Sequence, residues 1–268
     1  MKTIDELISL ENKKAVVTGG AGFIGLAICE TLMELGASVS IIDNNDQGCL
    51  DRCSELNKMN YQNKAYPLIV DLSDENKIRT SVNYCVDLMG GIDIVVHSAA
   101  FVGATKYPGW AVPFEHQTVN AWTKAMNVNL TSAFILTQSA IPFLKDSERA
   151  SIIFVSSIYG VVAPDFRIYE NTEMNTPAAY TASKAGLNQL CKYFSTLLAP
   201  TVRCNTITAG GVWREQSKLF VEEYIKKTPL QRMAIEEDFK GAIAYLASDL
   251  SSYVTGSDLV VDGGFTAW

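Results

Sequence analysis

The sequence carries a tyrosine and a lysine whose spacing could support proton transfer. Tyr180 and Lys184 lie four positions apart in the segment YTASK. On a helix, side chains at positions i and i+4 project from one face, so the phenol and the ammonium would lie together. A tyrosine with a pKa of about 10 is a poor base at neutral pH, but neighbouring positive charge favours its phenolate. The pair could therefore act as a general acid or base, although a surface Tyr–Lys pair without a chemical role is common.

A second candidate site is the glycine-rich segment VVTGGAGFIG, in which an apolar strand runs into a turn. Gly19 can take a tight turn, Gly22 lets the backbone approach a pyrophosphate, and Gly25 lets the following helix pack close to the strand. The helix that opens near Phe23 and Ile24 would offer unpaired N–H groups and a positive dipole end to phosphates. The segment therefore favours a nucleotide, and a closely packed turn without a ligand is the simpler alternative.

The second expected strand ends at Asp43, 18 residues after Gly25. A carboxylate at this point accepts hydrogen bonds from an adenosine ribose and would repel a 2′-phosphate. Neither Arg nor Lys occurs at positions 19–25 or 43–48. We therefore expect NAD as the cofactor rather than NADP. The alternative is that Asp43 only caps the next helix.

Short apolar runs alternate with helix-length amphipathic segments, and these elements would position the candidate residues. Strands that are apolar along their whole length are covered on both faces, which predicts a parallel sheet between two helix layers. The alternation predicts an α/β fold, a single doubly wound domain over residues 1–268. The expected strands span residues 14–19, 38–43, 66–71, 92–100, 151–157, 202–208 and 258–264. The expected helices span residues 23–36, 46–58, 74–89, 118–146 and 178–198.

The composition of the chain argues against some classes of binding partner. The chain has a net charge of −7 and no basic block, so nucleic acid and anionic membrane surfaces are poor candidates. The opening segment MKTIDELISL has acidic residues where a signal peptide needs an unbroken apolar run. The apolar stretches are too short to span a bilayer. We expect a cytoplasmic protein that acts on a small molecule.

The cysteines and histidines do not suggest a metal site. Six cysteines and two histidines are present, and their spacing fits no metal-binding pattern. Reduced, buried thiols are the expected state in a cytosolic chain of this size.

Several separated segments occur in the order that is typical of short-chain dehydrogenases/reductases. They are the glycine turn, Asp43, FVSSIYG, YTASK and the closing TGSDLVVDGG. The sequence resembles this family over nearly its whole length, from about residue 10 to the end. The resemblance implies a Rossmann domain with a seven-stranded parallel sheet. It also implies hydride transfer between a nicotinamide and a carbonyl/hydroxyl pair.

The resemblance further implies roles for individual residues. Tyr180 would transfer the proton, and Lys184 would lower the pKa of Tyr180 and hold the nicotinamide ribose. Ser157 would donate a hydrogen bond to the reacting oxygen, with its neighbour Ser156 as the less favoured choice.

Further roles follow from the same resemblance. Asn129, in the segment NVNL, would hold a water in the proton relay to Lys184. Asn127 is a rival for this role, and a mid-helix kink is the alternative explanation. Asp71 and Leu72 would flank the adenine, and Ala99 would lie against the cofactor.

The sequence departs from the family pattern in the segments around the cofactor. The turn reads T-G-x-x-G-x-x-G, as in the extended branch of nucleotide-sugar epimerases and dehydratases, with Phe23 where the short branch usually has glycine. The length of 268 residues and the YTASK and VDGG segments favour the short branch. His97 replaces the usual first Asn after the fourth strand. Ala209 replaces the usual proline after the sixth strand, and Val212 is the expected backbone contact to the nicotinamide amide.

An insert at residues 161–177 lies between the two catalytic residues and is longer than the family usually has. We expect this insert to form one wall of the substrate pocket. Arg167, its only cation, could hold a carboxylate or phosphate with two hydrogen bonds. Pairing of Arg167 with Glu170 or Glu173 is the alternative.

Two other segments are candidates for substrate binding. The loop after the fourth strand carries Trp110, and residues 210–229, called the lid below, carry Trp213 and Arg214 near their base. We expect the lid to be mobile. Loops rich in aromatic and hydrogen-bonding side chains suit a polyhydroxylated ligand, whereas solvated loop residues and buried Trp anchors are the alternative.

The pattern resembles gluconate-5-dehydrogenase-like enzymes, including oxidoreductases of bacterial surface-sugar biosynthesis. The favoured function is an NAD(H)-dependent oxidoreductase that interconverts a secondary alcohol and a ketone on a sugar, sugar acid or sugar-derived substrate. One alternative is a 3-oxoacyl-carrier-protein reductase, which would need a basic patch for its acidic carrier. Another is a non-catalytic NAD-binding regulator, which would not need the Ser, Tyr and Lys together.

We expect a homotetramer. Members of the family usually pair through their long fourth and fifth helices and through the last strand and helix. Phe265 and Trp268 lie at the chain end, where exposure to solvent would be unfavourable. The alternative is that this end folds back over its own subunit.

Overall fold

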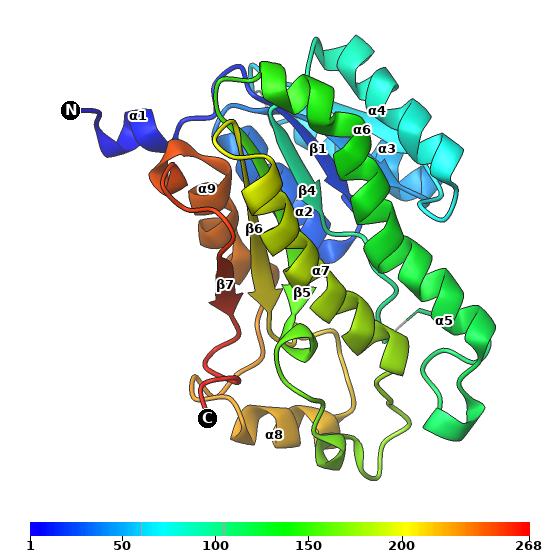
Figure 1. Ribbon diagram of the computed structural model, residues 1–268. Coiled ribbons are helices and arrows are strands. Elements are labelled where there is room, and N and C mark those ends of the chain that lie inside the picture. Colours follow the sequence, from blue (N-terminus) through cyan, green and yellow to red (C-terminus); the bar gives the residue numbers. More distant parts are fainter. Residues whose placement is uncertain (60, 104) are drawn as a thin grey trace.

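Seven parallel strands form the central sheet of the computed structural model, which describes residues 1–59, 61–103 and 105–268 (Figure 1). The strands are β1 (Lys14–Thr18), β2 (Ser38–Asp43), β3 (Ala65–Ile69), β4 (Ile94–His97), β5 (Ala150–Ser157), β6 (Val202–Ala209) and β7 (Asp258–Val261). They lie in the order β3-β2-β1-β4-β5-β6-β7, with parallel neighbours throughout. The strand order reverses between β1 and β4, which is where folds of this type bind ligands.

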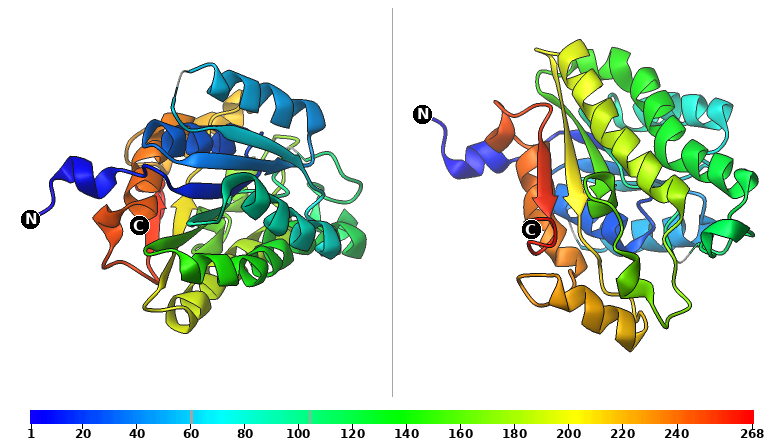
Figure 2. Two further views of the ribbon diagram at one scale, coloured as in Figure 1. Left: turned by 90° about the horizontal axis from the view of Figure 1, so that it is seen from above. Right: turned by 60° about the horizontal axis from the view of Figure 1, so that its bottom comes forward.

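Helices cover both faces of the sheet. They are α1 (Ile4–Ile8), α2 (Phe23–Glu34), α3 (Asp46–Asn57), α4 (Glu75–Met89), α5 (Val119–Met126), α6 (Ser132–Asp146), α7 (Ala178–Leu197), α8 (Lys218–Lys226) and α9 (Lys240–Ala247). A π-helix, η2 (Asn127–Thr131), joins α5 to α6. Helices α2, α3 and α9 pack on one face, and α4, α6 and α7 pack on the other. Figure 2 shows the sheet between these two layers.

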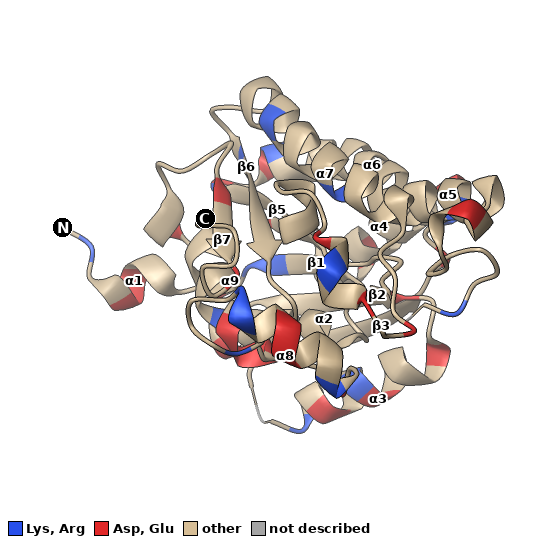
Figure 3. Ribbon diagram, turned by 90° about the horizontal axis from the view of Figure 1, so that it is seen from below, with Lys and Arg blue, Asp and Glu red and all other residues tan. Residues whose placement is uncertain are grey.

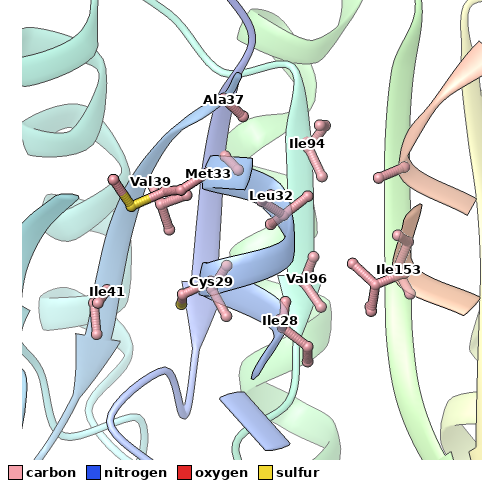
Figure 4. Packing of buried hydrophobic residues seen from close by; sticks show 14 of the residues in the cluster. Ile28, Cys29, Leu32, Met33, Ala37, Val39, Ile41, Ile94, Val96 and Ile153 are labelled. Carbon is pink, nitrogen blue, oxygen red and sulfur yellow. The ribbon is translucent and has the colours of Figure 1, made fainter. Parts of the chain in front are cut away.

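Side chains alternate between two cores along the strands. Val17 of β1 packs with α2, α3 and α9, whereas its neighbour Val16 packs with α4, α6 and α7. Figure 4 shows Ile28 and Leu32 of α2 beside Val96 of β4 in the first of these cores. Because both faces of the sheet are covered, the strands are apolar along their whole length.

The fold predicted from the sequence is confirmed. The seven expected strands and five expected helical segments form, within three residues of the expected bounds. Helices α1, α8 and α9 were not predicted. Helix α9 has 8 residues and contains a glycine, so its helical pattern is short and weak.

The loops that follow the strands gather at one edge of the sheet. The carboxyl ends of the strands face the side of the molecule on which α8 lies (Figure 1). Figure 3 views this edge and shows Lys and Arg interspersed with Asp and Glu over α3, α8 and α9. Within the described ranges, none of the helices is long and apolar enough to cross a lipid bilayer.

Candidate active site

A cleft of about 940 Å³ lies at the carboxyl ends of the strands. Its volume is that of a ligand-binding cavity. The predicted site residues that line it are Gly19, Gly22, Phe23, Ile24, Gly25, Asp43, Asp71, Leu72, Ala99, Ser157, Tyr180, Lys184, Val212 and Arg214. The cleft therefore brings together segments that are far apart in the sequence.

The glycine turn presents bare backbone to the cleft. Gly19 has a φ of 68°, and a Cβ there would lie 2.7 Å from the Cα of Ala99. A Cβ on Gly25 would collide with the carbonyl oxygen of Gly19, so α2 packs as closely on the turn as the sequence predicted. Gly22 is the N-cap of α2 and offers no side chain to the first N–H groups of the helix. These N–H groups can therefore bind phosphate oxygens, and the turn fits a dinucleotide pyrophosphate.

Phe23 supports an arginine that reaches across from the lid. The guanidinium carbon of Arg214 lies 4.2 Å from the centroid of the Phe23 ring, and Arg214 pairs with Glu236 at 2.8 Å. This is the geometry of a cation–π contact, which a glycine at position 23 could not make. From the sequence, Arg214 was expected to contact the substrate. The structure instead places it over the glycine turn, because the Phe23 ring and the Glu236 carboxylate hold it there.

Asp43 lines the cleft and does not cap α3. The cap is Asn45, whose side chain accepts a hydrogen bond of 3.0 Å from the backbone N–H of Gly48. Asp43 accepts a hydrogen bond of 3.2 Å from the backbone N–H of Asn45. The sequence analysis missed a cation in this region, since Lys124 comes from α5 and lies 3.4 Å from a carboxylate oxygen of Asp71. Pairing with Asp71 reduces the positive charge that Lys124 offers to a ligand.

Tyr180 and Lys184 face the cleft from the first turns of α7. The ammonium of Lys184 lies 5.7 Å from the centroid of the Tyr180 ring and donates a hydrogen bond of 2.7 Å to the carbonyl of Val155. Burial lowers the pKa of Lys184 to about 7. Burial also raises the pKa of Tyr180, and a hydrogen bond with Ser157 opposes that rise. The hydrogen bond with Ser157 thus favours the Tyr180 phenolate, and the contribution of Lys184 to the pKa of Tyr180 stays a prediction.

The two serines at the end of β5 have different partners. Ser156 donates a hydrogen bond of 3.1 Å to the backbone carbonyl of Lys184 and so joins β5 to α7. Ser157 accepts a hydrogen bond of 3.2 Å from the backbone N–H of Tyr159, and its hydroxyl is next to Tyr180. This arrangement favours Ser157 as the serine that contacts a substrate.

Asn129 lies in the π-helix η2, behind the cleft. It accepts a hydrogen bond of 2.7 Å from the backbone N–H of Phe101 and donates one of 3.0 Å to the hydroxyl of Ser183. The side chain is fully buried, and the helix is locally widened around it. Such π-turns are frequent at functional sites. The role of Asn129 in a water relay stays a prediction.

His97 takes a structural place at the end of β4. Its Nε2 lies 2.7 Å from the hydroxyl of Ser132 on α6. Burial, together with the charge of Lys184, lowers the pKa of His97 to about 3, so the ring is neutral at physiological pH. The residue that replaces the usual asparagine therefore joins the sheet to α6.

Comparison with known proteins adds to this geometry. A family model described as enoyl-(acyl carrier protein) reductase matches residues 19–266. Sorbose reductase of Schizosaccharomyces pombe is 30% identical over 272 residues, with 97% of this chain and 98% of the relative covered. The chain belongs to the short-chain dehydrogenase/reductase family.

A further relative and a solved structure are also similar to this chain. Post-translational flagellin modification protein A of Campylobacter coli is 30% identical over 258 residues, with 96% of this chain and 99% of the relative covered. The structure of a short-chain dehydrogenase from Leptospira borgpetersenii with bound NAD⁺ has a TM-score of 0.82 at 30% identity and covers 99% of this chain and 96% of its own. As a member of this family, the protein is an oxidoreductase that binds a nicotinamide cofactor and acts on an alcohol or carbonyl group.

Two tryptophans that the sequence analysis assigned to the substrate lie elsewhere in this short-chain dehydrogenase/reductase. Trp110 is 1% exposed and donates a hydrogen bond of 2.8 Å from its Nε1 to the carbonyl of Val102. It packs against Phe101 and anchors the loop after β4. Trp213 is exposed and is not among the residues that line the cleft.

Arg167 does not face the substrate side of the cleft. It makes hydrogen bonds of 2.8 Å and 2.7 Å to the two carboxylate oxygens of Asp165, and its side chain is 79% exposed. The alternative of an internal ion pair is therefore the observed one, with Asp165 as the partner instead of Glu170 or Glu173. Asp165 caps a short 3₁₀ helix (Phe166–Tyr169), which brings its carboxylate back toward Arg167.

The insert contributes to the cleft through other residues. Tyr169, Met174, Asn175, Thr176 and Pro177 line the cleft. The ring of Tyr169 lies 5.3 Å from that of Phe220 on α8, so the insert and the lid pack together in one apolar cluster. The wall predicted for residues 161–177 is present. Sequence reasoning missed Tyr159, which also lines the cleft, although it lies two positions after Ser157.

The C-terminal segment packs against the lid. The ring of Phe265 stacks on Tyr224 with centroids 4.8 Å apart, and Phe265 is buried in its own chain. The indole N–H of Trp268 donates a hydrogen bond of 3.1 Å to the carbonyl of Lys227. The expectation that Phe265 is exposed is therefore wrong, because this residue packs on its own subunit, whereas Trp268 is 79% exposed, as expected.

The six cysteines are all free and buried. Among the residues that the structure describes, no group of three His, Cys, Asp or Glu side chains could hold a metal ion.

Lys184→Met is expected to stabilise the cofactor-free protein more at pH 6 than at pH 9. The pKa of Lys184 falls from 10.5 to about 7 in the folded state, so below pH 7 the folded protein must bury a charge. As pH rises through this pKa, Lys184 loses its proton in the folded state before it does so in the unfolded state. The free-energy cost of burying the charged ammonium therefore decreases. The gain in the free energy of unfolding should thus be larger at pH 6 by roughly 2–3 kcal/mol.

Chemical denaturation of the wild type and the variant at both pH values measures this difference. Subtracting the two curves removes the contributions of all other titrating groups. An equal gain at both pH values would contradict the assigned burial of the charge.

Proposed function

We propose that this protein is an NAD(H)-dependent oxidoreductase that interconverts a secondary alcohol and a ketone on a sugar, a sugar acid or a related polyol. The observation that carries the proposal is the position of Ser157, Tyr180 and Lys184 in the same cleft as the glycine turn. The similarity to a sorbose reductase supports a carbohydrate substrate. The hydroxyl-rich wall of the cleft supports it as well, because polar groups in such cavities determine which ligand binds.

Each of these residues has a separate role in the proposed reaction. A bound nicotinamide supplies the hydride acceptor or donor. In alcohol oxidation, Tyr180 takes the hydroxyl proton, and Ser157 donates a hydrogen bond to the same oxygen. Lys184 holds the nicotinamide ribose, and Asn129 orients a water that passes the proton on. Residues 1–268 act as one domain in which the lid closes over the substrate.

The test is a turnover screen of sugars, sugar acids, polyols and nucleotide sugars with NAD⁺, and of their keto forms with NADH. Activity on at least one polyhydroxylated compound is expected. Activity on acyl-carrier-protein thioesters alone would favour a carrier-protein reductase, the class that the matching family model names. The interspersed charges at the cleft edge in Figure 3 argue against docking of an acidic carrier. Cofactor binding without any turnover would favour a regulator.

The wild type is expected to prefer NAD(H) over NADP(H), because Asp43 lies in the cleft and would repel a 2′-phosphate. Removing Asp43 and placing an arginine beside it, as Asp43→Ala with Asn44→Arg, should relax or reverse this preference. Ratios of kcat/KM for the two cofactors measure the effect. A wild-type preference for NADP(H) would contradict the assignment and would point to Lys124 as the group that accepts the phosphate.

We further propose a homotetramer in the cytoplasm. Exposed apolar side chains on α5, α6 and α7, namely Trp122, Phe134, Tyr193 and Leu197, offer a surface for a partner subunit. Six reduced thiols suit a reducing compartment. Light scattering at micromolar concentration checks the oligomeric state, and a monomer would reject this part of the proposal.

A further inference from the structure

Three hydroxyl groups form a continuous chain in the wall of the cleft. The phenol oxygens of Tyr159 and Tyr169 lie 2.7 Å apart, and the hydroxyl of Thr176 lies 2.5 Å from that of Tyr169. All three residues line the cleft. Tyr159 lies two residues after the end of β5, whereas Tyr169 and Thr176 belong to the insert at residues 161–177. The hydrogen-bonded chain therefore joins the insert to the strand that carries Ser157.

The hydroxyl chain is held rigidly beside the reacting groups. The backbone N–H of Tyr159 donates a hydrogen bond of 3.2 Å to the hydroxyl of Ser157. The ring of Tyr169 packs at 5.3 Å against Phe220, and Thr176 is buried. Side chains fixed in this way keep a constant position relative to the reacting carbon, as a specificity site requires.

The number of protons leaves one donor for a ligand. Three hydroxyls carry three protons, and the two hydrogen bonds within the chain use two of them. The described part of the protein provides no further acceptor for these three groups. Whichever way the two bonds run, one O–H remains, and leaving it without an acceptor in a half-buried wall is unfavourable.

We propose that the Tyr159–Tyr169–Thr176 chain binds a second hydroxyl of the substrate, next to the carbon that is oxidised or reduced. A hydroxyl suits this position because it can accept the free O–H and can also donate to a lone pair of the chain. The inference rests on the proposed function and specifies it: the enzyme selects α-hydroxy ketones and vicinal diols over simple ketones and alcohols. An alternative is that the three hydroxyls only tie the insert to β5.

The test compares 2-hydroxycyclohexanone with cyclohexanone as substrates with NADH. The two ketones differ by one hydroxyl beside the carbonyl. The wild type should have a kcat/KM roughly 2- to 13-fold higher for the hydroxylated ketone, as expected for one hydrogen bond to a positioned donor. Tyr169→Phe keeps the ring and removes the central hydroxyl, so the ratio of the two kcat/KM values should fall toward one. Tyr159→Phe should lower the same ratio.

A control is available on α4, away from the proposed subunit interface. Tyr84 is exposed and does not line the cleft, and Tyr84→Phe should leave the ratio as it is in the wild type. Melting temperatures and NADH dissociation constants of the variants distinguish a loss of preference for the hydroxylated ketone from misfolding. The ratio is informative because a purely structural role would lower both kcat/KM values together.

Several results would overturn the inference while leaving the proposed function in place. They are equal wild-type activity on both ketones, an unchanged ratio in Tyr169→Phe, and turnover of sugars without turnover of either ring ketone. Failure of every sugar, polyol and ketone to react would instead reject the proposed function itself.

Discussion

Tyr180→Phe is expected to abolish turnover while NAD(H) binding stays nearly intact. The substitution removes only the phenol oxygen, which is the atom that would exchange a proton with the substrate. Loss of a general acid or base lowers rates by roughly 10²- to 10⁴-fold. The dinucleotide would be held mainly by the glycine turn and Lys184, which the substitution does not touch.

Single-turnover kinetics measure the loss of turnover, and fluorescence titration with NADH measures cofactor binding. Tyr84→Phe on α4 is the control, since Tyr84 is exposed and is not among the residues that line the cleft. If Tyr180→Phe retained most of its activity, the proton-transfer mechanism would be wrong. If the variant lost NADH binding as well, the main role of Tyr180 would be to bind the cofactor.

Gly25→Ala is expected to destabilise the protein and to abolish cofactor binding. An added Cβ would meet the carbonyl of Gly19 and the Cα of Gly20, both of which are backbone atoms that no side-chain rotation can move. Helix α2 would have to shift away from the turn, taking its free N–H groups with it. Overpacking of this kind costs roughly 1–3 kcal/mol or more.

Gly241→Ala is the control for this substitution. Gly241 lies in α9 on the surface, and a Cβ there would have no neighbour within 4 Å. Replacing it should stabilise the protein by about 0.5–1 kcal/mol, because alanine favours the helix. Denaturant unfolding and NADH titration of both variants check the pair. Gly25→Ala with unaltered stability and binding would refute the close packing of α2 on the turn.

The sequence was sufficient to predict the strands, the turn and the presence of Ser157, Tyr180 and Lys184 in one cleft. Buried strands show as unbroken apolar runs, and Ser157, Tyr180 and Lys184 belong to motifs with fixed spacing. Side chains on loops were harder to place. Arg167 was expected near a ligand, but its partner Asp165 becomes available only because a short 3₁₀ helix turns the chain between them.

Residues from distant segments were the other source of error. Lys124 reaches the cleft from α5, outside the positions that the sequence analysis searched for cations near Asp43. Arg214 lines the cleft, but its stacking on Phe23 was not predicted, because this contact joins the lid to the glycine turn. Both are contacts between elements far apart in the chain, which spacing along a single sequence does not reveal.

The packing of Phe265 against Tyr224 affects where a tag can be placed on the purified enzyme. The last residues of the chain support α8, which in turn supports the Tyr169 wall. A purification tag or fusion partner attached after Trp268 would lie beside this support. The N-terminus projects away from the cleft beyond α1 (Figures 1 and 2), so an affinity tag placed there leaves the substrate side in its native state.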